Sequence, residues 1–329
     1  MEPFAVAHES AVCLANLVQD DGRFRYRYRL GSSRELDGYN VLRHAGAIWA
    51  LLDVYRETED PLLLKAGQRA ITYLLDAYLR FYRDYRYACI CEENKIKLGG
   101  NALAILALVS LYEFTKERFL LGLAEQLASY MLAERTTQGD FVHKRYFRSG
   151  KVSSFRSSYY TGEALFALVY LADVTADRQW LAAAETIEDR LAAQNYGVAE
   201  QSHWMLYFLE AFARHAFVPA YIDHAVRIGR HILDHPDYLS WRRSTPVACR
   251  TEGLLALLRL PETVGIDEDL RHNAWRQVRE NLERQLSFRR EDGSFIRGGD
   301  DGRSEEVRID YLQHNISSFL HFGRLAGRW

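Results

Sequence analysis

One helical pattern occurs six times along the sequence, and this repetition constrains the fold more than any other feature. Each copy starts with polar or aromatic residues and continues into an almost wholly apolar stretch, as in 157–168, where Gly162 and Glu163 precede the apolar part. The copies lie at 39–56, 101–114, 160–173, 201–213, 250–260 and 309–325. Apolar side chains recur every three to four residues, which predicts helices. Their apolar surface on every side predicts burial, with the N-terminus of each helix facing an open space.

Amphipathic helices alternate with the apolar ones. They are predicted at 4–18, 61–82, 117–134, 178–194, 219–233 and 268–286. Twelve alternating helices are typical of a closed repeat architecture. We therefore predict an all-α fold, an (α/α)6 barrel of six helical hairpins with the apolar helices inside. An open solenoid of helix pairs is the alternative. The barrel is favoured because there are six pairs and the first helix can pair with the last.

The connections differ in length on the two faces of this barrel. The turns from an inner to an outer helix are short, as at 58–61 and 175–177, whereas most returns are long. Aromatic and basic residues alternate at 23–29 and 141–147, which predicts short β-hairpin-like loops on that face. Because long loops carry function, we expect the principal cavity at the inner-helix N-termini, bounded by loops 20–38, 135–157 and 288–308. Since the chain has no Gly/Ser/Pro-rich linker, we predict one domain spanning 1–329.

Composition narrows the classes of partner. The 329 residues are 48% hydrophobic and carry a net charge of −2, so nothing points to nucleic acid or a membrane surface. The N-terminus lacks the basic start and apolar middle of a signal peptide. The four cysteines are scattered, as expected of a reduced, cytoplasmic protein. The sequence is compatible with a complete protein or with one domain of a longer, multidomain one.

The N-terminal ends of the six inner helices carry the candidate site residues. The catalytic candidates are Glu163, Glu252, His44, His314 and Tyr160, and the substrate-binding candidates are Arg43, Asn101, His203, Trp204, Arg250 and Asn315. Parallel helix N-termini favour an anion or a developing negative charge. Carboxylates, histidines, arginines and aromatic faces around one depression suit a sugar, including an acidic one. Loop acids on the same face are held in reserve: Asp37, Asp300, Asp301 and Asp310.

Each candidate also has a structural interpretation. The histidines can cap helices or form buried hydrogen bonds, and Glu163 and Glu252 can favour the helix dipole from the first turn. Trp204 and Tyr160 can belong to the core, and the arginines can pair with the acids. The recurrence of histidine at one repeat position is what favours a functional role.

Other chemistries lack their sequence signals. The pair Cys89 and Cys91 has no second cysteine pair, and Cys249 is not followed by histidine, so no thiolate zinc site and no other metal is expected. Neither a dinucleotide-binding nor a P-loop glycine motif is present, and no cofactor is predicted.

One stretch resembles a known superfamily. Tyr159-Tyr160-Thr161-Gly162-Glu163-Ala164-Leu165, followed by Asp173 and Trp180-Leu181-Ala182-Ala183-Ala184, is similar to the six-hairpin glycosidase superfamily. Within it, the stretch resembles the helical domain of D-glucuronyl C5-epimerases and, more loosely, unsaturated glucuronyl hydrolases. Lanthionine synthetase C-like proteins and terpenoid cyclases share the toroid, but this chain lacks the Cys/His zinc set of the former and the Asp-rich motifs of the latter.

Three functions follow as hypotheses. The first is a carbohydrate-active enzyme acting on a small saccharide, a glycan or a uronic acid. Glycosidic hydrolysis would use Glu163 and Glu252 as acid and base, whereas epimerisation or elimination would use Tyr160, His44 or His314 as base with Arg43 holding a carboxylate. The second is a toroidal enzyme acting on a peptide or isoprenoid. The third is a non-catalytic barrel that binds a glycan or a protein.

Overall fold

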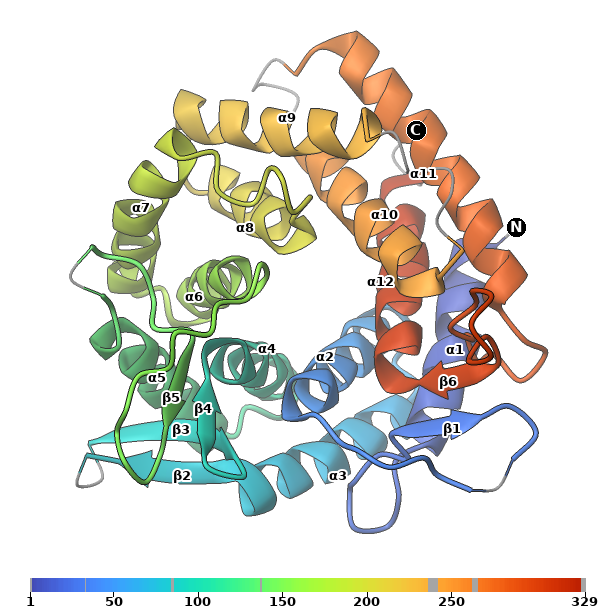
Figure 1. Cartoon of the computed structure of the whole chain (residues 1–329), viewed down its shortest axis with the longest axis horizontal. Helices are drawn as coiled ribbons and strands as arrows, with labels where there is room; N and C mark the ends of the chain where they lie inside the picture. The colour runs from blue at the N-terminus through green and yellow to red at the C-terminus, as the bar shows by residue number, and fades with distance from the viewer. Residues whose placement is uncertain are drawn as a thin grey trace.

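The computed structural model describes residues 2–32, 34–83, 86–136, 138–235, 242–261 and 266–326. This part of the chain contains twelve α-helices and six short strands, and the helices form two concentric rings (Figure 1). The inner ring consists of α2 (Val41–Thr58), α4 (Leu98–Thr115), α6 (Tyr160–Thr175), α8 (His203–Ala213), α10 (Ser244–Arg259) and α12 (Ile309–Ala326). The outer ring consists of α1 (Pro3–Asn16), α3 (Pro61–Tyr78), α5 (Arg118–Ala133), α7 (Arg178–Ala193), α9 (Pro219–Leu233) and α11 (Glu268–Phe288).

The inner ring is closed. Each inner helix packs against the next one, and α12 packs against both α10 and α2. The first helix, α1, packs against α12, which joins the two ends of the chain (Figure 1). The predicted (α/α)6 barrel is therefore confirmed, and the open solenoid is excluded.

Burial explains why one set of helices lies inside. In α4, every residue from Leu98 to Leu111 is buried. This helix is also long and apolar enough to cross a membrane by length and composition alone, but 78% of it is buried inside the fold, as expected of a core helix. In α9 only one face is buried, as expected of an outer helix.

The short turns on one face have a local explanation. The inner helices α2 and α6 are capped at their C-terminal ends by Glu59 and Ala176, whose φ angles of 52° and 55° place them in the left-handed region that closes a helix. The next residues, Asp60 and Asp177, accept hydrogen bonds from the backbone of the following outer helices and so act as their N-caps. The residue that ends one helix is followed directly by the residue that caps the next, so the polypeptide reverses direction within a few residues.

The long connections contain more strand than the sequence predicted. The helix expected at 61–82 ends at Tyr78, and 79–82 forms β2 (Leu79–Tyr82). The polar connection that follows is β3 (Tyr87–Glu92) and β4 (Lys95–Lys97), which with β5 (Lys144–Tyr146) make a four-stranded antiparallel sheet in the order β2-β3-β4-β5. The strands are only three to six residues long, and β5 joins β4 from a distant segment, so local periodicity does not reveal them.

A second pair of strands lies at the N-terminal mouth of the barrel. Of the strand predicted at 23–29, only β1 (Arg27–Arg29) forms, and it pairs with β6 (Glu306–Arg308) immediately before α12. Ser33 and Thr137, in two of the predicted rim loops, lie outside the described residues. One inner helix also differs from its prediction: α10 begins at Ser244, so Arg250 and Glu252 lie in its second and third turns rather than at its start.

Candidate active site

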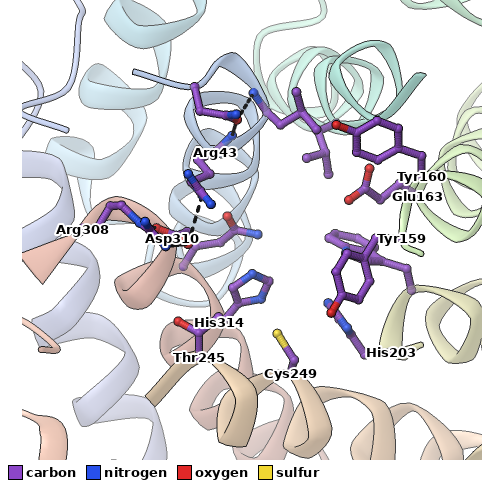
Figure 2. Close-up of a pocket in the computed structure, with 15 residues that line it drawn as sticks. Arg43, Tyr159, Tyr160, Glu163, His203, Thr245, Cys249, Arg308, Asp310 and His314 are labelled. Carbon is purple, nitrogen blue, oxygen red and sulfur yellow. Dashed lines mark hydrogen bonds and ion pairs between the residues drawn. The ribbon is translucent and has the colours of Figure 1, made fainter. Parts of the chain in front are cut away.

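A cavity of about 320 Å³ opens at the N-terminal ends of the inner helices (Figure 2). Six of the residues predicted for the site line it: Arg43, Tyr160, Glu163, His203, Trp204 and His314. Asp310, one of the acids held in reserve, also lines it, and residues that the sequence did not name as candidates complete the wall, among them Asn40, Tyr159, Thr245, Cys249, Arg308 and Gln313. Figure 2 shows Glu163 and Tyr160 on one side of the cavity, with Arg308 and Asp310 on the other.

Glu163 lies in the first turn of α6 and is only 5% exposed. Its Oε2 atom has no hydrogen-bond partner among the described residues. Gly99 leaves the room for this carboxyl group, since a Cβ there would overlap with Oε2 and with the ring of Tyr160. Burial raises the pKa of Glu163 to about 8, against a smaller opposing effect of the charge on His314. Glu163 is therefore protonated at neutral pH and able to donate a proton.

His314 is held by a buried carboxylate. Its Nδ1 atom lies 2.8 Å from Oε2 of Glu252, while the hydroxyl of Tyr207 donates to Oε1 of the same carboxylate over 2.9 Å. Glu252 is 1% exposed. Burial opposes the charging of His314, but Cys249 and Glu252 outweigh it and raise the pKa of His314 well above its ordinary value. This histidine therefore favours the imidazolium form.

His203 has the opposite preference. It is 2% exposed, and neither of its ring nitrogens has a hydrogen-bond partner within the described structure. Burial, followed by the charges of His314 and Arg250, lowers the pKa of His203 well below its ordinary value. Its ring centroid lies 5.5 Å from that of His314. Two histidines thus meet in one cavity, one neutral with free nitrogens and the other favouring the charged form.

A cluster of charged side chains forms the far wall. Asp310, in the first turn of α12, lies 3.1 Å from Nε of Arg43 and 2.5 Å from Nε of Arg308. Burial alone would raise the pKa of Asp310, but the two guanidinium groups lower it overall. Arg43 also donates to the hydroxyl of Tyr26 over 2.6 Å. Two cations share one carboxylate here, so the wall suits the hydroxyl or carboxylate oxygens of a ligand.

Two candidates from the sequence lie away from the cavity. His44 is fully buried between Tyr39, whose hydroxyl is 2.7 Å from Nδ1, and Ala70, whose carbonyl accepts from Nε2 over 2.8 Å. Asn101 accepts a hydrogen bond from the backbone of Ile90 over 2.9 Å and so anchors β3 to α4. For both residues, position in the structure supports the structural interpretation rather than a role in this cavity.

Three more candidates stand behind the cavity wall. Asn315 donates to the carbonyl of Tyr311 one turn earlier in α12, and Arg250 donates to Gln201 over 2.6 Å. Glu252 does not line the cavity, but it acts on it through His314. The late position of Arg250 and Glu252 follows from the early start of α10.

Four donor atoms that metals favour converge at this place. One atom each of His203, Cys249, Glu252 and His314 lies within 4.8 Å of the others. Nitrogen, sulfur and oxygen donors of this kind suit zinc, and the sequence analysis missed the set because it comes from three helices. Both oxygens of Glu252 are, however, already engaged by Tyr207 and His314. Glu252 and His314 thus already form a hydrogen-bonded acid–base pair.

A second cavity, of about 650 Å³, opens at the opposite mouth, where the inner helices end. It is the larger of the two, so the prediction that the principal cavity lies at the N-terminal mouth is wrong by volume. Its charged groups are already paired, as in the contacts of Arg56 with Glu113 (2.6 Å) and Arg324 with Asp53 (2.9 Å). One buried nitrogen there, Nη1 of Arg259, has no hydrogen-bond partner within the described structure. The buried carboxyl group of Glu163 and the ring nitrogens of His203, which can exchange protons, lie at the N-terminal cavity, which remains the better candidate for chemistry.

Comparison with known proteins identifies the fold. No protein-family model and no curated protein sequence matches the chain. Among solved structures, D-mannose isomerase aligns with a TM-score of 0.77 at 12% identity, covering 98% of this chain and 97% of that one. The chain and D-mannose isomerase therefore share one fold.

Two further structures show the range of this fold. Cellobiose 2-epimerase from Bacillus thermoamylovorans aligns with a TM-score of 0.73 at 13% identity over 95% of both chains. Unsaturated glucuronyl hydrolase from Bacillus sp. GL1 aligns with a TM-score of 0.72 at 15% identity, over 98% of this chain and 97% of that one. The resemblance that the sequence showed to the superfamily and to these hydrolases is thus confirmed at the level of fold.

Proposed function

We propose that the protein is a sugar isomerase or epimerase, which moves a proton at a carbon beside the carbonyl group of an open-chain sugar. The observation that carries this proposal is the pair of facing histidines with opposite protonation preferences, His203 and His314. Groups whose environments push their pKa values apart divide into a base and an acid.

The roles follow from the contacts of each ring. His203 is neutral and its nitrogens are unpartnered, so it removes the proton from carbon. His314, held by Glu252, donates a proton to the carbonyl oxygen as the electrons of the broken C–H bond move to form the enediol. Return of a proton to the same or the neighbouring carbon completes epimerisation or isomerisation. Protonated Glu163 provides a further donor for the oxygens of the intermediate.

The cavity supports a small saccharide as the substrate. Its volume of about 320 Å³ is at the low end of ligand sites. Tyr159, Tyr160 and Trp204 offer aromatic faces to a sugar ring, and Arg43 and Arg308 offer donors to its hydroxyl or carboxylate groups. D-mannose isomerase and cellobiose 2-epimerase are, by their names, a sugar isomerase and a sugar epimerase, and their likeness to this chain supports the proposal.

Glycosidic hydrolysis is the alternative, and a separate observation favours it. The pKa of Glu163 is raised to about 8 whereas that of Asp310 is lowered, and both carboxyl groups line the cavity. A protonated acid and an ionised carboxylate are the two groups that glycosidases require. The sequence analysis proposed Glu252 as the partner of Glu163 in hydrolysis. In this alternative, Asp310 takes that place.

Incubation with a panel of sugars in D2O separates the two reactions. Panel members are aldoses, ketoses, uronates and short disaccharides, and products are followed by proton NMR. Isomerase or epimerase activity gives a new isomer with deuterium at the reacting carbon, and His203→Asn abolishes both. Release of a free reducing sugar without exchange at carbon would favour hydrolysis. If no panel member yields either product, the catalytic proposal is overturned and a binding module is favoured. Cytoplasmic location, a single domain and the lack of nucleic-acid and membrane partners stay predictions from the sequence.

A further inference from the structure

A chain of hydrogen-bonded side chains passes through the barrel from the cavity at the N-terminal mouth to the larger one at the opposite mouth. In order, it consists of His314, Glu252, Tyr207, His321 and Asp53. The four contacts measure 2.8, 2.9, 3.2 and 3.2 Å. His314 lines the first cavity, whereas Tyr207, His321 and Asp53 line the second.

The middle members of this hydrogen-bonded series are almost completely buried. Glu252 and Tyr207 are each 1% exposed, and His321 is 6% exposed. Buried polar groups are costly unless every one is hydrogen-bonded, so the protons must be distributed to satisfy the whole chain. Asp53 fixes one end: burial opposes its ionisation, but Arg324 and His321 lower its pKa overall. It is therefore an acceptor, and Nε2 of His321 donates to it.

Burial and the charge of Glu252 raise the pKa of Tyr207 well above its ordinary value, so its hydroxyl stays protonated. Only two arrangements of protons then satisfy every contact. In the first, Tyr207 donates to ionised Glu252, and the charged ring of His321 donates from Nδ1 to the oxygen of Tyr207. In the second, protonated Glu252 donates to the oxygen of Tyr207, and Tyr207 donates to Nδ1 of neutral His321. Any other arrangement sets two lone pairs or two protons against each other.

The two arrangements differ by one proton transfer in two hops. The Nδ1 proton of His321 passes to the oxygen of Tyr207 while the hydroxyl proton of Tyr207 passes to Oε1 of Glu252. The proton count and net charge of the chain are unchanged, and no electron is gained or lost. The two hops together neutralise Glu252 and His321. The remaining anion is Asp53, which lies 2.9 Å from Arg324.

We propose that Tyr207 and His321 form a proton relay that couples the charge of Glu252, and hence the protonation of His314, to the opposite cavity. The catalytic use of this relay rests on the proposed function. When His314 gives up its proton, ionised Glu252 would be left as an unpaired buried charge, a costly state. The proton from His321 neutralises Glu252 at that moment. Tyr207 and His321 are therefore positioning residues that act through His314.

Charged groups around the relay act on the proton of His321 from both sides. Arg259 of α10 lies over the ring of Tyr207, 5.8 Å from its centroid, and Arg324 lies beyond Asp53. Burial, followed by the charge of Arg259, lowers the pKa of His321, whereas Asp53 opposes this. His203 and Cys249 are the other titratable groups near the Glu252 end. The guanidinium group of Arg259 thus disfavours a proton resting on His321.

Histidine NMR tests the relay without requiring a substrate. In protein labelled with 15N on histidine, the ring nitrogens report the protonation and tautomer of His314 and His321 across a pH titration. We expect the two rings to titrate in a linked manner, each showing a step at the midpoint of the other. Tyr207→Phe keeps the ring and removes the hydroxyl, so the linkage should vanish. Tyr221→Phe, which removes a hydroxyl bonded to Asp189 far from the chain, is the matched control and should retain it.

Persistence of the linkage in Tyr207→Phe, or its absence from the unaltered protein, would overturn the relay. If Tyr207→Phe does not fold, as judged by its melting curve, His321→Gln breaks the same chain one position later and serves instead. Where a turned-over sugar has been found, the alkaline limb of the kcat profile should shift by about one pH unit in Tyr207→Phe, with KM little changed. An unshifted limb would refute the catalytic use of the relay while leaving the isomerase proposal intact. Conversely, a linked titration with no sugar turned over would uphold the relay and refute the isomerase.

Discussion

His203 and His314 meet edge to face in the N-terminal cavity, with ring centroids 5.5 Å apart and ring planes at 82°. They come from the first turn of α8 and the second turn of α12, two inner helices that both pack against α10. One ring has no hydrogen-bond partner in the described structure, and the other is bound to a buried carboxylate. The same residue type therefore serves two different purposes, which is the arrangement that proton transfer to and from one substrate needs.

Replacing His203 by Asn should abolish turnover without unfolding the protein. Because neither ring nitrogen holds another residue, the loss leaves no protein donor or acceptor unpaired. General base catalysis is worth about 10²–10⁴-fold, and kcat/KM on the active sugar should fall by that order while the melting temperature changes little. Activity within a few-fold of the unaltered protein would show that His203 is not the base.

His44 provides the contrasting case. It joins the hydroxyl of Tyr39 to the carbonyl of Ala70 outside the cavity, and burial lowers its pKa to about 4. His44→Ala removes one hydrogen bond from each partner and opens a void, so denaturant unfolding should show a loss of about 1–3 kcal/mol with kcat unchanged in the folded fraction. A selective loss of kcat would restore the catalytic role that the sequence suggested.

Glu163→Gln tests the raised carboxyl pKa through stability. The folded-state pKa of about 8 exceeds the ordinary value of 4.5, so the folded protein holds a proton that the unfolded chain has lost between these two values. The contribution of Glu163 to stability is therefore full below pH 4.5, declines as the pH rises to about 8, and is constant above it. The total decline is at most roughly 5 kcal/mol.

Urea unfolding of both proteins from pH 4 to pH 9 measures this effect. The difference in unfolding free energy between the unaltered protein and Glu163→Gln should fall across the window, in favour of the variant. A difference independent of pH would mean that Glu163 ionises normally. If Glu163 also donates a proton to the intermediate, turnover of the variant falls, since an amide does not titrate.

The barrel was predictable from the sequence because its signal is local and repeated. Leu98 to Leu111 of α4 are buried without exception, and a helix that is apolar on nearly every side is expected to lie inside. The strands were less predictable because β1 gains its partner from β6, which lies about 280 residues further along the chain. The missed start of α10 has a similar cause, since the backbone of Ser244 at its first turn is held by Arg297 of a distant loop.

The candidate site was predictable as a place, but not as a set of contacts. Six proposed residues do line the cavity, because repeat position alone brings helix starts together. Which way a side chain points within a turn depends on packing, and so His44 faces outward towards α3 while Arg43, one residue earlier, faces the cavity. Cys249 and Glu252 were misjudged because their neighbours His203 and His314 come from other helices.

Chelation should leave the activity unchanged. The donors of His203, Cys249, Glu252 and His314 converge within 4.8 Å, but the proposed chemistry needs only their protons. Protein treated with EDTA and desalted should keep its kcat and its histidine NMR spectrum. Loss of activity that zinc or cobalt restores, together with an absorption band from cobalt bound to the Cys249 thiolate, would show instead that the four residues bind a metal. Cys249→Ser is the control, since it would remove that band.

The pH dependence of kcat/KM provides the sharpest test of the acid–base assignment. Two histidines with the ordinary pKa of 6.5 would give a narrow bell centred on that value. Here burial, aided by the charges of His314 and Arg250, lowers the pKa of His203, so the base stays neutral well below pH 6.5. The pKa of His314 is raised because Cys249 and Glu252 outweigh burial, so the acid stays charged well above pH 6.5. We therefore expect a broad plateau across neutrality, with an alkaline limb caused by deprotonation of His314 and of Glu163 near pH 8.

Glu252→Gln tests which residue causes the alkaline limb. The substitution removes the anion that favours charged His314, so the alkaline limb should move to lower pH while the acid limb stays in place. A narrow bell at pH 6.5, or an acid limb that moves with Glu252→Gln, would contradict the assignment of His203 as base and His314 as acid.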